Sequence, residues 1–315
     1  MEDMTTNQPD QPDQPDQPDQ PDQSDPIPSA TGASAAGAST AGAPAAGASA
    51  AGAGSPSAAA GASASRAGSP PPAAGRVAVV TGGSRGIGRA VSLKLAQAGL
   101  AVVVNYASDA AAAEETVAAI TAAGGRAIAV RADVADENAV AALFDRAEQE
   151  FGGVDAVVNC AGRLALSPVA DLDLTVLDAV YRTNIRGTFA VAQQAARRLR
   201  AGGSFVGFST SVVGTQFPAY AAYASSKAAV ETLTMILARE LRGRDITVNT
   251  VAPGPTATDL FLEGKTPELI DQLAKTPPLE RLGTPEDIAE VVAFLTSPAG
   301  HWVNGQTLRA NGGMV

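Results

Sequence analysis

The sequence contains very few of the residues on which several common kinds of active site depend. Among 315 residues there is one cysteine, Cys160, and one histidine, His301. A lone cysteine excludes an intrachain disulfide, and a lone histidine argues strongly against a Ser-His-Asp hydrolase or a cysteine/histidine metal site. We therefore expect no metal site and a packed rather than reactive Cys160. The chemistry has to rest on other side chains.

The chain also lacks the long apolar runs of membrane spans and secretory signals. No basic start leads into an apolar core, and the alanine-rich stretch is interrupted by Gly, Ser and Pro. Neither pattern is that of a signal peptide or a spanning helix. Together with the lone cysteine, this favours a reducing cytoplasm and no membrane partner.

Residues 1–74 are poor in large apolar side chains. They hold Pro-Asp-Gln triplets and then an Ala/Gly/Ser/Pro tract, in which Ile27 is the only large aliphatic residue apart from Met1 and Met4. Such a segment cannot bury enough apolar surface to offset its ordering entropy, so we expect a disordered tail. The tail has eight acids and one base, Arg66, and therefore most of the net charge of −10. The mildly acidic remainder gives no indication of a nucleic-acid partner.

Residues 75–315 are long enough for one sizeable α/β domain. Short apolar runs alternate with helical patterns such as Gly86–Ala98, Ala110–Ala123 and Asn138–Phe151. This alternation predicts a doubly wound parallel sheet of the Rossmann type, with its ligand crevice at the carboxyl ends of the strands. The expected strands are Val77–Val80, Ala101–Val104, Ala127–Ala132, Val154–Val158, Ser204–Phe208, Ile246–Val251 and Thr307–Arg309.

A glycine-rich turn joins the first expected strand to the first helix. Gly82, Gly86 and Gly88 lie in Thr81–Gly88, with the spacing G-x-x-x-G-x-G. Glycine lets the backbone approach a pyrophosphate closely, and the helix N-terminus offers free N–H groups and a positive dipole end. The alternative is a tight strand-to-helix turn without a ligand. The position after the first strand of a βαβ unit favours phosphate binding.

Two further strand ends border the predicted crevice. Asp133 ends the third strand, where it can accept a hydrogen bond from an adenine amino group, and the run 159–162 (Asn-Cys-Ala-Gly) ends the fourth. The small residues Ala161 and Gly162 leave room for a cofactor. Each signal alone is weak, because Asp and Asn are ordinary turn formers.

Tyr223 and Lys227 form the strongest pair in the sequence. Residues four apart share one face of a helix and lie roughly 6 Å apart along its axis. A phenol has a pKa of about 10, and a neighbouring ammonium lowers it towards a useful range. A hydroxyl in the run 209–211 (Ser-Thr-Ser), at the preceding strand end, can hydrogen-bond a substrate oxygen. Asn184, placed mid-helix, indicates a specific hydrogen bond.

The region 75–315 resembles the short-chain dehydrogenase/reductase family along its whole length. The resemblance implies a Rossmann fold, a nicotinamide cofactor, a tetramer or dimer, and a catalytic set of Asn, Ser, Tyr and Lys. The matching motifs, in the family's order, are Thr81–Gly88, Asp133, Asn159–Gly162, Asn184, Ser211, Tyr223–Lys227, Asn249 and Pro253-Gly254. The catalytic set falls on Asn184, Ser211, Tyr223 and Lys227. The expected cofactor contacts are Gly82, Ser84, Arg85, Gly86, Ile87, Gly88, Asn105, Ser108, Asp133, Val134, Asn159, Ala161, Gly162, Tyr223, Lys227, Pro253, Gly254 and Thr258.

Three positions depart from the family's usual pattern. Cys160 stands where asparagine is usual, and Thr256 stands where an aliphatic residue is usual. Ser211 lies twelve residues before Tyr223, whereas thirteen is the commoner spacing. Ser209 therefore stays open as an alternative to Ser211.

The resemblance implies a mechanism in which Tyr223 protonates the substrate oxygen while nicotinamide supplies the hydride. Ser211 holds that oxygen, Lys227 lowers the phenol pKa and binds the nicotinamide ribose, and Asn184 supports the proton relay.

The end of the second expected strand favours NADP(H) over NAD(H). An NAD site usually carries an acid there to bind the ribose 2′-hydroxyl, but this strand ends in Asn105 and Tyr106. Arg85 can pair with a 2′-phosphate and Ser108 can add a hydrogen bond. Asp109 is the one nearby carboxylate that favours NAD(H) instead.

The substrate is less specified than the chemistry. Residues 260–278 are expected to form the lid over a small-molecule carbonyl substrate, and the chain resembles 3-oxoacyl-carrier-protein reductases most. Arg197, Arg198 and Arg200 either meet an acidic acyl carrier protein or form a solvated helix end, and the second interpretation is favoured. The alternative function is a non-catalytic dinucleotide-binding sensor or scaffold.

Overall fold

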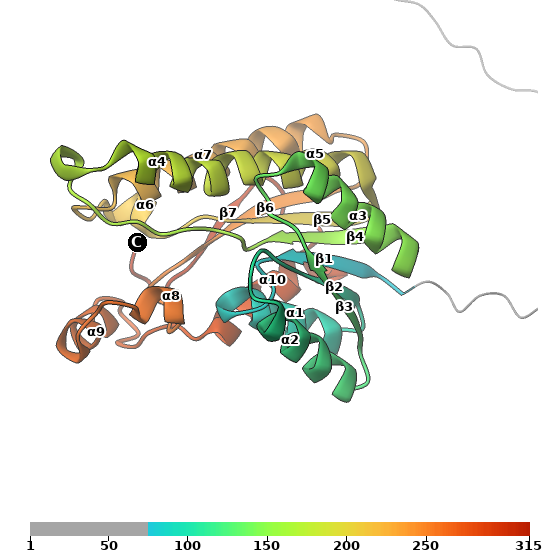
Figure 1. Ribbon diagram of the computed structural model, residues 1–315, viewed down its shortest axis with the longest axis horizontal. Coiled ribbons are helices and arrows are strands. Elements are labelled where there is room, and N and C mark those ends of the chain that lie inside the picture. The colour runs from blue at the N-terminus through green and yellow to red at the C-terminus, as the bar shows by residue number, and fades with distance from the viewer. Residues whose placement is uncertain (1–74) are drawn as a thin grey trace, which may run out of the picture. The chain divides into compact units, whose positions relative to one another are not determined.

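The computed structural model describes residues 75–315. The interpretation of residues 1–74 as a disordered tail lies outside the described residues. Seven parallel strands form one sheet in the order β3-β2-β1-β4-β5-β6-β7, which confirms the predicted doubly wound fold (Figure 1). The strands are β1 Val77–Thr81, β2 Ala101–Tyr106, β3 Arg126–Arg131, β4 Val154–Asn159, β5 Leu199–Phe208, β6 Thr247–Pro253 and β7 Thr307–Ala310.

The central strands are rich in valine because both faces of the sheet are covered. Successive side chains alternate between two cores, so that Val80 packs with the helices on one face and Val79 with those on the other. Helices α1 and α10 pack together on the first face, and α3 and α5 pack together on the second (Figure 1). The main helices are α1 Gly86–Gln97, α2 Ala110–Ala122, α3 Glu137–Phe151, α4 Leu174–Tyr181, α5 Gly187–Arg198, α7 Ala221–Glu240 and α10 Pro285–Leu295.

Two elements differ from the sequence-based expectation. β5 begins at Leu199 rather than Ser204, and its register against β4 shifts between Val154 and Ala156. Arg200, in this early part of β5, is ion-paired with Asp155 of β4, which holds the extension in place. The second difference is a π-helical turn, Arg182–Arg186, between α4 and α5.

The order of the strands reverses between β1 and β4, which are direct neighbours. Adjacent loops leave this point in opposite directions, and ligands of doubly wound sheets bind in the resulting crevice. Three short helices lie near the same edge: α6 Val212–Thr215, α8 Asp259–Leu262 and α9 Pro267–Ala274. Helices α8 and α9 fall in the expected lid region and lie across from α4 in Figure 1. No helix within residues 75–315 has the length and apolar character needed to cross a bilayer.

Candidate active site

The turn after β1 has a backbone conformation that requires glycine. Gly82 and Gly86 have φ angles of +60° and +52°, a region that other residues rarely adopt. A Cβ at Gly88 would collide with the carbonyl oxygen of Gly82. The N-cap of α1, Arg85, makes no side-chain cap, so the first N–H groups of the helix have no partner from it. This turn fits a pyrophosphate, and Ser84 and Ile87 lie within it.

Three residues that the sequence predicted to contact the cofactor near the end of β2 differ in their exposure. Arg85 and Ser108 are exposed, whereas Asn105 is buried and donates its amide to the carbonyl oxygens of Val130 and Ala132 at 3.2 and 3.0 Å. The side-chain amide of Asn105 therefore ties β2 to β3. The Asp109 carboxylate accepts a hydrogen bond from the N–H of Ala112 at 3.0 Å and caps α2.

Asp133, at the end of β3, is engaged within the protein. Its two carboxylate oxygens accept from the Ala135 N–H and from Arg182, each at 2.9 Å. The Ala135 N–H and the Arg182 guanidinium lower the pKa of this carboxyl, against the opposing effect of burial. The following residue, Val134, is buried against the start of α5 at Gly187.

Asn159 joins three elements at the end of β4. Its oxygen accepts from the Thr81 hydroxyl of β1 at 2.6 Å, and its amide donates to the Thr188 hydroxyl of α5 at 2.9 Å. A Cβ on Gly82 would come within 3.1 Å of the Ala161 backbone, so the two strand-end loops lie in contact. Burial raises the pKa of the neighbouring Cys160 thiol, which agrees with a packed and unreactive side chain.

Gly162 lies against two of the predicted catalytic residues. A Cβ there would meet Lys227 Nζ at 3.3 Å and Asn184 Oδ1 at 3.5 Å. Asn184 is fully buried in the π-helical turn, accepts from the Arg163 N–H at 2.8 Å and donates to the Ser226 hydroxyl at 2.9 Å. Such turns are frequent at functional sites. The turn connects the β4 loop to the helix that carries Lys227.

Tyr223 and Lys227 lie on one face of α7, as the spacing predicts. Lys227 Nζ is 5.8 Å from the centre of the Tyr223 ring and donates to the Phe208 carbonyl at 2.9 Å. Burial lowers the pKa of Lys227 to about 8. Tyr223 is half-buried as a whole, but burial of its phenol raises the pKa to about 12, opposed by a hydrogen bond from Thr210.

The expectation that Lys227 lowers the phenol pKa is thus not met in this structure. Desolvation outweighs every favourable contact of the hydroxyl, and the ammonium is directed at a main-chain carbonyl. Tyr223 is therefore a protonated phenol throughout the neutral range, which suits a proton donor.

The three hydroxyls at the end of β5 have different surroundings. Ser209 donates to Glu231 at 2.6 Å, away from the phenol. Thr210, which the sequence interpretation did not select, lies thirteen residues before Tyr223 and contacts its hydroxyl. Ser211 donates to the Ala252 carbonyl at 3.2 Å and accepts from the Asn311 amide at 2.9 Å.

The β6 end closes the other side of the crevice. Pro253 accepts from the Ser211 N–H, and Gly254 donates its N–H to the Ala310 carbonyl. Thr258 caps α8, and its methyl carbon lies 3.4 Å from where a Cβ on Gly86 would be. The expected lid region, residues 260–278, therefore begins close to the glycine turn. Within residues 75–315, no cluster of three or more His, Cys, Asp or Glu residues is arranged to hold a metal ion.

Residues 82–315 match a family model described as enoyl-(acyl carrier protein) reductase. A short-chain type dehydrogenase/reductase of Picea abies is 46% identical, covering 76% of this chain and 92% of its own. The Arabidopsis thaliana protein named NADPH-dependent aldehyde reductase-like protein, chloroplastic, is 44% identical, covering 76% and 94%.

This chain belongs to the short-chain dehydrogenase/reductase family. A short-chain dehydrogenase of Burkholderia cenocepacia, solved in complex with NADP, is similar in structure, with a TM-score of 0.72 and 39% identity over 76% of this chain and 97% of its own. The family assignment from the sequence is confirmed, and with it the class of oxidoreductase rather than a non-catalytic scaffold. A short-chain dehydrogenase/reductase acts on carbonyl and alcohol groups, and this structure places a half-buried phenol, Tyr223, beside a buried lysine, Lys227.

Proposed function

We propose that this protein is an NADP(H)-dependent carbonyl reductase with Tyr223 as its proton donor. The observation that carries the proposal is the position of Gly162. It belongs to the loop that borders the dinucleotide crevice, and it lies against both Lys227 and Asn184. A cofactor held by that loop therefore borders the acid-base pair directly.

Each proposed catalytic group has a separate task. The bound dinucleotide supplies a hydride to the carbonyl carbon. Tyr223 donates its proton to the carbonyl oxygen, and Ser211 holds that oxygen by a hydrogen bond. Lys227, whose Nζ lies next to Gly162, binds the ribose of the cofactor, and Asn184 connects Lys227 to the β4 loop through Ser226.

The preference for NADP(H) rests on the loop after β2. The only acid there, Asp109, caps α2 with one carboxylate oxygen, which holds this side chain at the start of that helix. Arg85 and Ser108 stay exposed beside the glycine turn and can bind a 2′-phosphate. The name of the Arabidopsis relative and the NADP in the Burkholderia structure agree with this preference.

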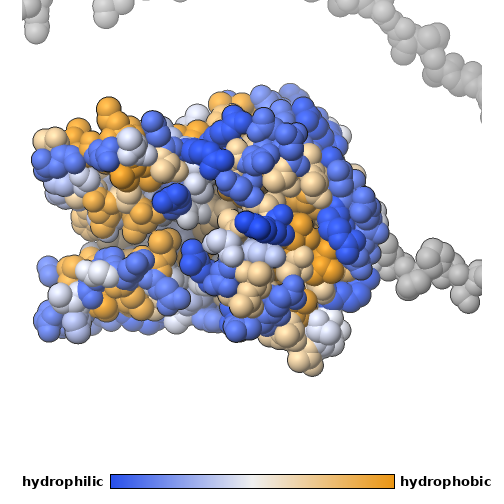
Figure 2. Space-filling view, viewed as in Figure 1, coloured by the Kyte–Doolittle hydropathy of each residue, from blue (hydrophilic) through white to orange (hydrophobic). Residues whose placement is uncertain are grey.

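The substrate is proposed to be an apolar aldehyde or ketone. The lid region exposes Leu260, Leu269 and Leu279, and α4 exposes Leu174 and Val176. Figure 2 shows a surface hollowed between these two parts, with hydrophobic residues on both sides. An apolar substrate gains free energy by covering such side chains.

An acyl carrier protein is not favoured as the partner. Arg198 pairs with Asp145 and Glu148, and Arg200 pairs with Asp155. Arg198 and Arg200 are therefore already paired with acids, and all three arginines, the exposed Arg197 included, lie where α5 joins β5, at the amino ends of the strands and away from the crevice. A surface for an acidic carrier would need free cations near the lid.

Three coarser properties complete the proposal. We place the catalytic domain in residues 75–315, because every proposed catalytic and cofactor residue lies there. We expect a homotetramer or homodimer, and a cytoplasmic location, as the sequence suggested. Size-exclusion chromatography with light scattering and cell fractionation test the last two.

Turnover of a substrate panel tests the function. NADPH and NADH are each offered with aromatic aldehydes, aryl ketones, quinones and a 3-oxoacyl thioester, and oxidation of the reduced cofactor is followed by absorbance. We expect NADPH oxidation with the apolar aldehydes and ketones. Cofactor binding without turnover across the whole panel would instead assign a sensor or scaffold.

A further inference from the structure

The segment that follows β7 reaches the candidate active site. Asn311 is nearly buried, with 9% of its surface exposed, and a Cβ on Gly254 would lie 2.9 Å from its Cα. A Cβ on Gly214 would lie 3.1 Å from a side-chain carbon of Val315, so the segment also packs on α6. None of these contacts was expected from the sequence.

The orientation of the Asn311 amide is determined by its hydrogen bonds. Its Oδ1 accepts from the N–H groups of Gly313 and Met314 at 3.0 and 3.2 Å. Because main-chain N–H groups are donors only, the atom facing them has to be oxygen. The nitrogen Nδ2 is therefore the atom that lies 2.9 Å from Ser211 Oγ.

This orientation determines where the Ser211 proton goes. An amide nitrogen has no acceptor capacity, so Asn311 donates to Ser211 Oγ and the serine proton has to point elsewhere. In the structure it points to the Ala252 carbonyl at 3.2 Å. The donated hydrogen bond also polarises the hydroxyl and makes its proton a stronger donor.

We propose that Asn311 is a positioning residue that keeps the Ser211 hydroxyl oriented as a hydrogen-bond donor to the substrate carbonyl oxygen. The proposal rests on the function proposed above. The two ends of the amide have separate tasks: Oδ1 folds the turn at residues 311–314, and Nδ2 orients Ser211. Nδ2 also donates a longer hydrogen bond of 3.4 Å to the Val315 carbonyl, so the contact with Ser211 has to be tested separately from the folding of this turn.

Asn311→Asp separates the two tasks. The carboxylate keeps an acceptor for the turn, but its second oxygen accepts the Ser211 proton and withdraws it from the substrate. We expect kcat to fall about 10- to 100-fold, somewhat less than removal of a direct oxyanion donor costs, with the Kd for NADPH nearly unchanged. We also expect kcat to recover below about pH 4, where the protonated carboxyl donates again.

A matched control makes the same chemical change in the same part of the chain. Asn304 accepts from the Val248 N–H at 2.8 Å, before β7 and away from Ser211. Asn304→Asp keeps that acceptor, and we expect its kcat to stay within about twofold of the parent.

A double-mutant cycle decides the question. Ser211→Ala, Asn311→Asp and the double variant are compared for kcat, KM and melting temperature. We expect the Asn311 change to cost less than about twofold in the Ser211→Ala background, because no hydroxyl is left to orient. Multiplicative losses, or an Asn311→Asp variant as active as the parent, would overturn the proposal.

Two further measurements keep the result interpretable. If Asn311→Asp does not fold, the same cycle is carried out with Asn311→Ala, which removes the donor, and losses that multiply again overturn the proposal. Failure of the proposed function has a different signature, since the parent protein would then show no turnover on the carbonyl panel.

Discussion

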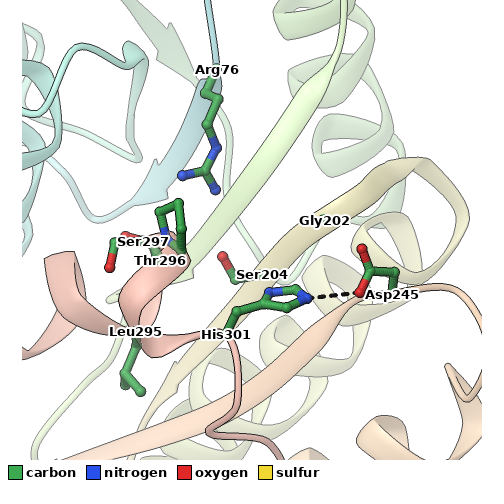
Figure 3. A pocket seen from close by; sticks show the side chains of 9 residues that line it. Arg76, Gly202, Ser204, Asp245, Leu295, Thr296, Ser297 and His301 are labelled. Atoms are coloured by element: carbon green, nitrogen blue, oxygen red, sulfur yellow. Dashed lines mark hydrogen bonds and ion pairs between the residues drawn. The ribbon is translucent and has the colours of Figure 1, made fainter.

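The sheet has one hollow at the carboxyl ends of its strands and another at their amino ends, and both hollows contain ionisable groups. At the carboxyl ends of the strands, Tyr223 and Lys227 are withdrawn from solvent and burial moves both pKa values, to about 12 and about 8. At the amino ends, a cavity of about 320 Å³ is lined by Arg76, Asp245 and His301 (Figure 3). There the side chains of His301 and Asp245 are 38% and 67% exposed, and His301 Nε2 lies 2.8 Å from an Asp245 carboxylate oxygen, within hydrogen-bonding distance.

The comparison shows that burial, rather than the presence of ionisable side chains, distinguishes the proposed catalytic groups at the carboxyl ends of the strands. An exposed pair of polar side chains is screened by water and contributes little to stability. A buried lysine without a carboxylate partner is costly to keep, and such groups concentrate at functional sites. Figure 3 shows an acid, a base and a hydroxyl close together at the amino ends of the strands, but the shifted pKa values belong to Tyr223 and Lys227 at the carboxyl ends.

The largest expected effect is that of Tyr223→Phe. Loss of the phenolic proton should lower kcat by about 10²- to 10⁴-fold, while the ring and the Kd for NADPH are retained. Tyr220→Phe, three residues earlier, is the matched control and should stay within about threefold of the parent, since Tyr220 is not assigned a proton transfer. Near-parent activity of Tyr223→Phe would mean that the buried phenol at the carboxyl ends matters no more for catalysis than the exposed groups at the amino ends.

The next effect is on the pH dependence of reduction. Lys227 is charged below its pKa of about 8 and loses its proton above it, so kcat/KM for the carbonyl should fall as the pH rises through about 8. The Tyr223 phenol keeps its proton over the same range, because its pKa is about 12. A profile that stays flat to pH 9.5 would show that Lys227 does not act through its charge.

A smaller effect is expected for cofactor choice. Arg85→Ala should lower kcat/KM for NADPH by about 10-fold and leave that for NADH nearly unchanged, because a charged pair with the 2′-phosphate is lost. Arg89→Ala, also exposed and one helical turn further along α1, is the control. Equal losses with both cofactors would assign Arg85 to the turn itself.

The smallest effect should come from the open cavity. His301→Ala removes the exposed hydrogen bond with Asp245, and we expect kcat/KM within about twofold of the parent and little change in melting temperature. A loss of activity above about tenfold would mean that the cavity at the amino ends of the strands is coupled to the proposed active site at their carboxyl ends.

The fold was largely predictable because its strands are buried on both faces and therefore read as valine-rich runs. The glycine turn and the Tyr223/Lys227 pair were predictable for a similar reason, since both are local patterns. The early start of β5 was not, because it depends on Arg200 pairing with a residue of another strand. The bonds of Asn105 to the carbonyls of Val130 and Ala132 were not predictable, because the sequence does not show which neighbouring strand an amide faces.

The contacts of Ser211 were beyond sequence reasoning for another reason. Its partner Asn311 is 100 residues away along the chain. From the sequence, only the rule that parallel strands have their carboxyl ends on the same side of a sheet predicts that the two residues lie near each other. An Asn-Gly-Gly turn directly after the last expected strand was the available signal. The π-helical turn around Asn184 likewise depends on tertiary contacts that no local pattern contains.

β7 follows every other strand of the sheet in chain order, and this gives the enzyme an order of maturation on the ribosome. The glycine turn and the strands β1 to β4 emerge first and can begin to pair during synthesis. Asn311 emerges after all of them. A nascent chain can thus acquire its nucleotide-binding half well before its serine is oriented, and a reducing centre is not completed until the last strand has docked.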